Sequence, residues 1–272
     1  MRGGEVIPFV KAHACGNDFL IVDDALAQGK HAEMARMLCA RNTGVGADGV
    51  EYIAPEKDGR IAIRLMNADG SEAEISGNGT RCVAAWLAYS AEKKEVVILT
   101  KAGPRQCRVI SQMGSTVQIE TEMGVPVVQP RTLRLTEEIT LQGAEVSVGN
   151  PHFVLFVETE DFSVGGLSWQ QMGEKIALHP AFPHGTNAEF VRILNKQTIE
   201  FRIYERGVGP TLSSGTGTCA SASASIALRG VDTKLTVVAE GGAQKIDWPS
   251  KNHPILLTGS ATIIARGEAG LA

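Results

Sequence analysis

The 272-residue chain contains few aromatic residues, no basic run and no long hydrophobic segment. Aromatic residues make up 5% of the chain and its net charge is −4, so we do not expect nucleic acid as its main partner. No apolar run approaches the roughly 20 residues that a membrane span needs. The first residues also lack the continuous apolar core of a secretory signal. We therefore expect a protein that binds neither nucleic acid nor a membrane.

Cysteine is also scarce, and its placement excludes two classes of site. The five cysteines are odd in number and contain no Cys-x-x-Cys pair, and the six histidines show no metal-ligand spacing. Scattered cysteines of this kind are typical of reduced thiols. We therefore expect a cytoplasmic protein without a disulfide framework or a metal site. The cysteines are Cys15, Cys39, Cys82, Cys107 and Cys219.

One stretch of the sequence is present twice. Residues 63–80 and 201–218 align without a gap at an offset of 138 residues (214 minus 76), and both end in Ser-Gly-x-Gly-Thr. Each copy predicts a strand, a turn and a glycine-rich helix start. Two weaker boxes pair in the same order, 16–22 with 149–155 and 44–50 with 185–191. Solenoid repeats have periods of about 20–50 residues, so this spacing indicates a duplicated domain instead.

The hydrophobic patterns predict an α+β protein rich in strands. A hydrophobic content of 43% and a charged content of 21% are typical of a globular chain. A proline-rich break at residues 125–130 is expected to connect the two halves, and one strand is expected near 133–141. Helical spacing predicts four helices, at residues 31–41, 80–92, 168–178 and 216–229.

The two glycine-rich helix starts are candidate anion sites. A helix N-terminus exposes free N–H groups and carries about half a positive charge, and glycine lets a ligand approach the backbone closely. The simpler alternative is that Ser76 and Ser214 are only N-cap residues, with glycines that shape the turn. Because the pattern is duplicated, and no Gly-Lys-Ser/Thr sequence follows, we favour a site for an amino-acid carboxylate over one for phosphate.

Short sequence motifs, found in order along essentially the whole chain, resemble those of the diaminopimelate epimerase family. The resemblance implies two pseudo-symmetric halves, 1–122 plus 260–272 and 123–259, each a curled, barrel-like sheet around a central helix. It also implies interconversion of LL- and meso-diaminopimelate in lysine and peptidoglycan precursor synthesis, without pyridoxal phosphate, metal or other cofactor. The boxes lie at residues 13–20, 44–48, 67–72, 77–82, 149–152, 204–209 and 215–220.

Inversion of an α-carbon requires two proton-transfer groups, one for each face. The family carries a cysteine immediately before each glycine-rich box, where this chain has Ser76 and Ser214. A thiol titrates near 8.5, whereas a serine hydroxyl is far less acidic and needs a neighbouring base. The resemblance implies that His152 lies beside Ser76 and Glu205 beside Ser214, as assisting residues.

The resemblance also implies a set of substrate-binding residues. Arg206 is suited to a distal carboxylate, because its planar guanidinium can pair with two oxygens. Three departures from the family pattern leave a different or shorter amino acid open: Gly49, Pro210 and residues 184–186. The side chains implied to hold the two ends of the substrate are Asn17, Asn67, Asn150, Asn187, Glu205 and Arg206. The backbone amides implied to bind the α-carboxylate are those of Gly77, Asn78, Gly215 and Thr216.

Three explanations of the serines remain open at this point. Both family cysteines were replaced to inactivate the enzyme, or the serines are natural and are activated by His152 and Glu205, or the chain binds an amino acid without turning it over. A racemase, epimerase or dehydratase acting on another amino acid on the same fold also remains open. The sequence leaves the oligomeric state, including a homodimer, undecided.

Overall fold

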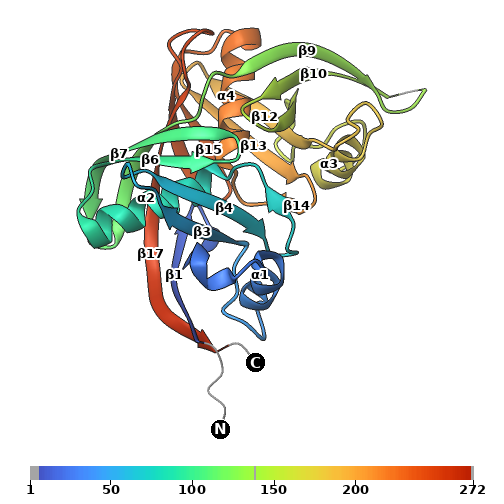
Figure 1. The fold of residues 1–272 in the computed structure, drawn as a ribbon. Helices are drawn as coiled ribbons and strands as arrows, with labels where there is room; N and C mark the ends of the chain where they lie inside the picture. Colours follow the sequence, from blue (N-terminus) through green and yellow to red (C-terminus); the bar gives the residue numbers. More distant parts are fainter. Residues whose placement is uncertain (1–5, 138, 271–272) are drawn as a thin grey trace. The chain divides into compact units, whose positions relative to one another are not determined.

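The computed structural model describes residues 6–137 and 139–270 (Figure 1). The chain divides into two compact units, the first formed by Met1–Thr121 with Gly259–Ala272 and the second by Glu122–Thr258. These boundaries lie one residue from those that the resemblance implies. None of the described helices is both long enough and apolar enough to cross a membrane.

The strands of the first unit form a closed ring. Neighbours pair in the order β1, β2, β3, β4, β6, β7, β8 and β17, and β17 pairs with β1 in turn. The pairs β2–β3 and β4–β6 are parallel, and the short β5 (Glu72–Ala73) adds to β4. The ring strands are β1 (Val6–Ala14), β2 (Asn17–Asp23), β3 (Gly49–Pro55), β4 (Ile61–Asn67), β6 (Glu95–Thr100), β7 (Gly103–Met113), β8 (Thr116–Glu122) and the later part of β17 (Leu256–Gly270).

The second unit repeats this topology. Its strands pair in the order β9, β10, β11, β12, β13, β15, β16 and β17, with β11–β12 and β13–β15 again parallel. Backbone bonds between Met123 and Ile255 (2.9 Å) and between Ile255 and Gly124 (2.8 Å) join the segments that precede β9 and β17. The strands are β9 (Val127–Arg134), β10 (Thr140–Ser147), β11 (Pro151–Phe156), β12 (Asn187–Asn195), β13 (Thr198–Glu205), β14 (Gly209–Thr211), β15 (Lys234–Ala239) and β16 (Gly242–Asp247).

One helix is central to each unit, and a second one packs outside. The first eleven residues of α4 (Gly215–Arg229) are all buried, as are the first nine of α2 (Gly77–Ala91). A helix buried on all sides belongs to a core, and α4 contacts strands β9 to β13, β15 and β16 around it. The outer helices are α1 (His31–Cys39), on β3 and β4, and α3 (Trp169–Ala177), on β12 and β13. The predicted α+β class, with a curled sheet around a central helix in each half, is confirmed.

Two details of the predicted elements are wrong. The segment 125–130 is a break only in part, since β9 includes Pro130, which lies opposite Ala144. The strand predicted at 133–141 is a hairpin, in which Leu135 and Ile139 share a backbone bond of 2.9 Å. Alternating apolar residues continue through this turn, so the period of two does not reveal it.

Candidate active site

In the first unit, Ser76 caps the start of α2. Its backbone is extended, and its Oγ accepts a hydrogen bond from the N–H of Gly79 at 3.0 Å. A Cβ on Gly79 would overlap with Oε1 of Glu51, so a larger residue at this point requires the Glu51 side chain to move. Gly77 and Asn78 are buried as well. The predicted N-cap role of Ser76 is therefore present in the structure, and the helix start is packed from behind by a carboxyl group.

A chain of polar contacts connects this helix start to the Gly-Asn turn. Asn78 donates to Asn17 Oδ1 at 3.3 Å, and Asn17 donates to Asp48 Oδ2 at 2.7 Å. Arg41 binds Asp48 at 2.6 Å, and Arg81 donates to Asn78 Oδ1 at 2.5 Å. Asn17 and Asn78, both predicted to bind substrate, are thus held together by direct contacts.

Next to these polar contacts, the Asp18 side chain is an ionised carboxylate. Although burial acts in the opposite direction, the hydrogen bonds and charges of Arg41 and Lys11 lower the pKa of Asp18 below its usual value. Asn67, at the end of β4, donates to Ser71 at 3.0 Å and lies opposite Gly49 in the sheet register.

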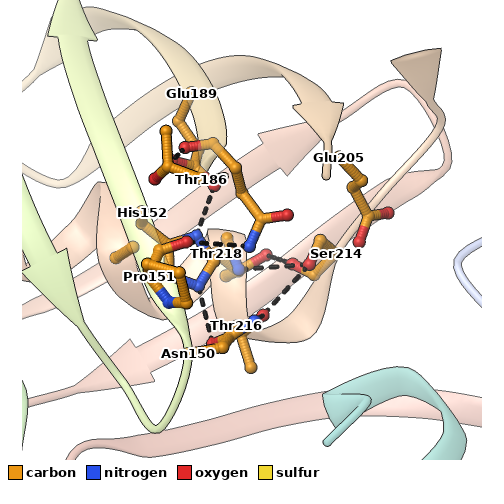
Figure 2. Close-up of polar contacts among 12 residues, drawn as sticks. Asn150, Pro151, His152, Thr186, Glu189, Glu205, Ser214, Thr216 and Thr218 are labelled. Atoms are coloured by element: carbon orange, nitrogen blue, oxygen red, sulfur yellow. Dashed lines mark hydrogen bonds and ion pairs between the residues drawn. The ribbon is translucent and has the colours of Figure 1, made fainter. Parts of the chain in front are cut away.

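In the second unit, Ser214 caps α4 in the same way (Figure 2). Its Oγ accepts from the N–H of Gly217 at 3.2 Å and lies 3.3 Å from Oγ1 of Thr216. Ser214 is 7% exposed, so its hydroxyl is almost removed from water. A Cβ on Gly217 would lie 3.1 Å from Oε1 of Glu189, which is the arrangement seen at Gly79 and Glu51.

A line of polar contacts leads from the buried Glu189 towards Ser214 (Figure 2). His152 Nδ1 lies 2.6 Å from Glu189 Oε1, and His152 Nε2 lies 2.8 Å from Asn150 Oδ1. Asn150 donates in turn to Thr216 Oγ1 at 3.3 Å. Since an amide oxygen only accepts, Nε2 carries a hydrogen. The other proton of the pair is then shared between His152 Nδ1 and Glu189.

Both members of this pair are 0% exposed. Burial raises the pKa of Glu189, and the neighbouring His152 opposes that effect. A proton held between a buried carboxyl and an imidazole is a feature that proton-transfer sites share.

A second group in this unit surrounds Arg206. Asn187 accepts from the Arg206 backbone N–H at 2.9 Å and donates to the Pro151 carbonyl at 3.0 Å. The guanidinium donates to the His184 carbonyl at 3.2 Å. Gly185 has a φ of +71°, and a Cβ there would lie 3.0 Å from the Arg206 side chain. Residues 184–186, which depart from the family pattern, therefore contact and support the Arg206 side chain.

The other two departures have local structural contexts. A Cβ on Gly49 would already lie 2.8 Å from the Met66 carbonyl oxygen, so the close approach of β3 and β4 excludes a larger residue in this backbone position. Pro210 lies in β14 opposite Tyr204. Glu205 accepts a hydrogen bond from Thr211 at 2.5 Å. The predicted pairing of Glu205 with Ser214 stays a prediction. The predicted pairing of His152 with Ser76 also stays a prediction, because these two residues belong to different units.

The strand register corrects one sequence alignment and adds two residues to the site. Equivalent strand pairs join Phe19 to Gly49 and His152 to Asn187, so residues 49 and 187 correspond. The paired boxes 44–50 and 185–191 were therefore aligned three residues out of step. At the corrected offset of 138 (189 minus 51), Glu51 corresponds to Glu189. Ser76 and Ser214 are separated by the same 138 residues, and this equal spacing is the signal that sequence reasoning missed.

The cysteines near the helix starts lie in the core. Cys82 and Cys219 are fully buried within α2 and α4, and burial raises the pKa of the Cys82 thiol far above neutrality. All five cysteines are free. Among the described residues, no group of three or more His, Cys, Asp or Glu side chains could hold a metal ion.

Comparison with known proteins agrees with the duplication of the chain. The family model described as diaminopimelate epimerase matches residues 9–128 and again residues 145–264, once in each half. The chain belongs to the diaminopimelate epimerase family. The resemblance seen in the sequence is thereby confirmed, and with it the assignment to a family of isomerases.

Individual relatives match along nearly the whole chain. A diaminopimelate epimerase of Moorella thermoacetica is 35% identical over 96% of this chain and 98% of its own length. One of Heliobacterium modesticaldum is 34% identical over 97% and 99%. Among solved structures, a hydroxyproline epimerase of Agrobacterium vitis has a TM-score of 0.74 at 14% identity, and covers 99% of this chain and 92% of its own. At that identity the last comparison supports the fold alone.

The packing at Gly79 leads to a stability prediction. Gly79→Ala should lower the free energy of unfolding by about 1–3 kcal/mol, because the new methyl group collides with Glu51. Urea denaturation measures the change. In a Glu51→Ala background the loss should be clearly smaller. Gly270→Ala, where a Cβ meets nothing within 4 Å, is the matched control. An equal loss in both backgrounds would show that Glu51 does not set the space at this helix start.

Proposed function

We propose that this protein is a cofactor-independent epimerase that interconverts LL- and meso-diaminopimelate in the synthesis of lysine and peptidoglycan precursors. The observation that carries the proposal is the duplicated serine-capped helix start, within a chain whose relatives over nearly the full length are named diaminopimelate epimerases. The five free cysteines suit a reducing compartment, so we place the activity in the cytoplasm.

The reaction needs two groups that exchange a proton with the α-carbon, one for each face. The duplicated boxes supply two candidates, Ser76 in the first unit and Ser214 in the second. Each accepts a hydrogen bond from a helix N–H, an arrangement that favours an oxygen carrying negative charge. His152 and Glu205 are the assisting residues in this proposal. In the second unit a proton is shared between Glu189 and His152, and the contacts through Asn150 and Thr216 hold these groups in place next to Ser214.

The substrate's α-carboxylate carries the charge that develops when the proton leaves. Backbone amides at the helix starts stabilise such a charge without reorganising. We assign this role to the amides of Gly77, Asn78, Gly215 and Thr216. Asn17, Asn67, Asn150, Asn187, Glu205 and Arg206 hold the two ends of the substrate, with Arg206 on the distal carboxylate.

The two serines limit the rate of proton exchange at the α-carbon in this protein. A thiol near pKa 8.5 exchanges protons readily at neutral pH, whereas a serine hydroxyl depends on a neighbouring base. The helix N–H groups of Gly79 and Gly217 fix the oxygens of Ser76 and Ser214 in place but do not supply a base of matched acidity. We therefore propose that the protein binds diaminopimelate and epimerises it slowly.

Replacing both serines by cysteine should restore fast exchange. In Ser76→Cys/Ser214→Cys, the α-proton of diaminopimelate should exchange in deuterated water at least about 100-fold faster than in the serine form, the size of a general acid–base contribution. Proton NMR follows the exchange. Ser223→Cys, also buried in α4, is the control and should change nothing. Equal rates in both proteins would remove Ser76 and Ser214 from the proton-transfer positions.

A different amino acid is the second candidate substrate. Residues 184–186, which depart from the family pattern, contact the Arg206 side chain that is proposed to bind the distal carboxylate. If Arg206 pairs with a distal carboxylate, Arg206→Lys should weaken meso-diaminopimelate binding about tenfold and leave proline binding unchanged, because a lysine cannot pair with two oxygens. Isothermal titration with meso-diaminopimelate, glutamate, histidine and proline measures this. Arg108→Lys, on an exposed strand, is the control. Heat with proline and none with meso-diaminopimelate would replace the named substrate.

A further inference from the structure

Glu51 is a buried carboxyl group for which the proposed reaction has no use. It is 0% exposed, and neither carboxyl oxygen has a hydrogen-bond partner among the described residues. Its side chain is aimed at the first turn of α2, where Oε1 lies against Gly79. Gly79 is the residue whose N–H binds Ser76. A fully buried acid without a hydrogen-bond partner among the described residues therefore lies directly behind a candidate carboxylate site.

The same place in the second unit is built differently. Glu189 corresponds to Glu51, but it shares a proton with His152. The residue that corresponds to His152 in the first unit is Phe19, as the equivalent registers of β2–β3 and β11–β12 show. A phenyl ring neither donates nor accepts a proton, so the carboxyl of Glu51 has to hold its own proton or carry a buried charge.

We propose that Glu51 is a positioning residue for the carboxylate site formed by the first amides of α2. Protonated, it fills the space behind Gly79 without charge; ionised, it places a negative charge behind the helix amides and weakens their hold on an anion. The second unit lacks this response because Glu189 is compensated by His152. The ligand class is an amino-acid α-carboxylate, and the inference rests on the proposed function of this helix start.

The surroundings of Glu51 support a protonated acid at neutral pH. Burial raises the pKa of Glu51 to about 8, and no charged group is among the causes of the shift. The register partners of Glu51, Ile21 in β2 and Leu65 in β4, are apolar.

Titratable groups do lie on the elements packed around Glu51. From β2, Asp18 is neutralised by Lys11 and Arg41; from α2, Arg81 is engaged by Asn78 and Cys82 is held as a thiol. Arg64 of β4 is exposed. Because positions 76 and 214 are serines, no thiol titrates there near pH 8.5, so the serine protein isolates the response of Glu51.

Binding measured against pH tests the inference. We expect the Kd of the protein for meso-diaminopimelate to rise at least about tenfold more between pH 7 and pH 9.5 than that of Glu51→Gln, since an ionised Glu51 repels the anion at short range. Titration of the ligand itself is common to both proteins and cancels in the ratio. Glu51→Met, of similar length and without a polar group, is the second variant. Glu33→Gln, an exposed acid in α1, should behave like the unchanged protein.

Stability against pH gives a readout that needs no ligand. The unfolded chain ionises Glu51 near its usual value of 4.5, whereas the folded chain keeps the proton up to about pH 8. The unfolded state therefore binds fewer protons between these values, so the contribution of Glu51 to stability falls as pH rises through this window. The stability advantage of Glu51→Gln over the unchanged protein should grow from pH 5 to pH 8 and then stay level. Urea unfolding at each pH measures it.

The outcomes separate the two proposals. Equal pH dependence of binding in the unchanged protein and Glu51→Gln, or a stability difference that does not change with pH, overturns the role of Glu51 and leaves the proposed function intact. Absence of meso-diaminopimelate binding to all variants at every pH overturns the proposed function, and the positioning role with it. A larger Kd increase in the unchanged protein, together with the growing stability difference, supports both.

Discussion

The structure depends on how two buried helix starts satisfy their backbone N–H groups. The first N–H groups of a helix have no partner within the helix, and leaving them buried without one costs free energy. In α2 and α4, a serine side chain accepts one of these bonds, from Gly79 and Gly217. The glycines of the first turn carry no side chain, so in the proposed function the remaining amides are the ones that bind a ligand oxygen. The same constraint that requires the caps therefore underlies the proposed carboxylate sites.

The strand rings explain why the helix starts are buried at all. Each ring contains parallel pairs at equivalent places, β2–β3 and β4–β6 in one unit and β11–β12 and β13–β15 in the other. The long crossovers that such pairs need carry α1 and α2, or α3 and α4. One helix of each pair is enclosed by its own ring, and its N-terminus follows directly after a short strand.

The duplication has not kept the two helix starts chemically equal. Glu189 has an imidazole beside it, whereas Glu51 has a phenyl ring at the equivalent position. The second unit can therefore share a proton within its core, whereas the first holds its proton on a single buried acid. The two helix starts therefore differ in the charge that can develop behind them, although their serine caps are alike.

The duplication, the helix starts and most of the strands could be predicted from the sequence, because alternation, glycine spacing and serine caps are local patterns. The family followed from the order of its motifs along the chain. Ser76 and Ser214 follow from the local patterns, whereas Asn17, Asn150 and His152 were predicted from the family resemblance. Three features needed the folded structure: the hairpin after β9, the strand registers that make Gly49 and Asn187 equivalent, and the burial of Glu51 and Glu189 behind the helix starts. These features arise from contacts between strands far apart in the chain. A carboxyl group in a strand has the same letter in the sequence whether it faces water or a helix N-terminus, and only packing decides which.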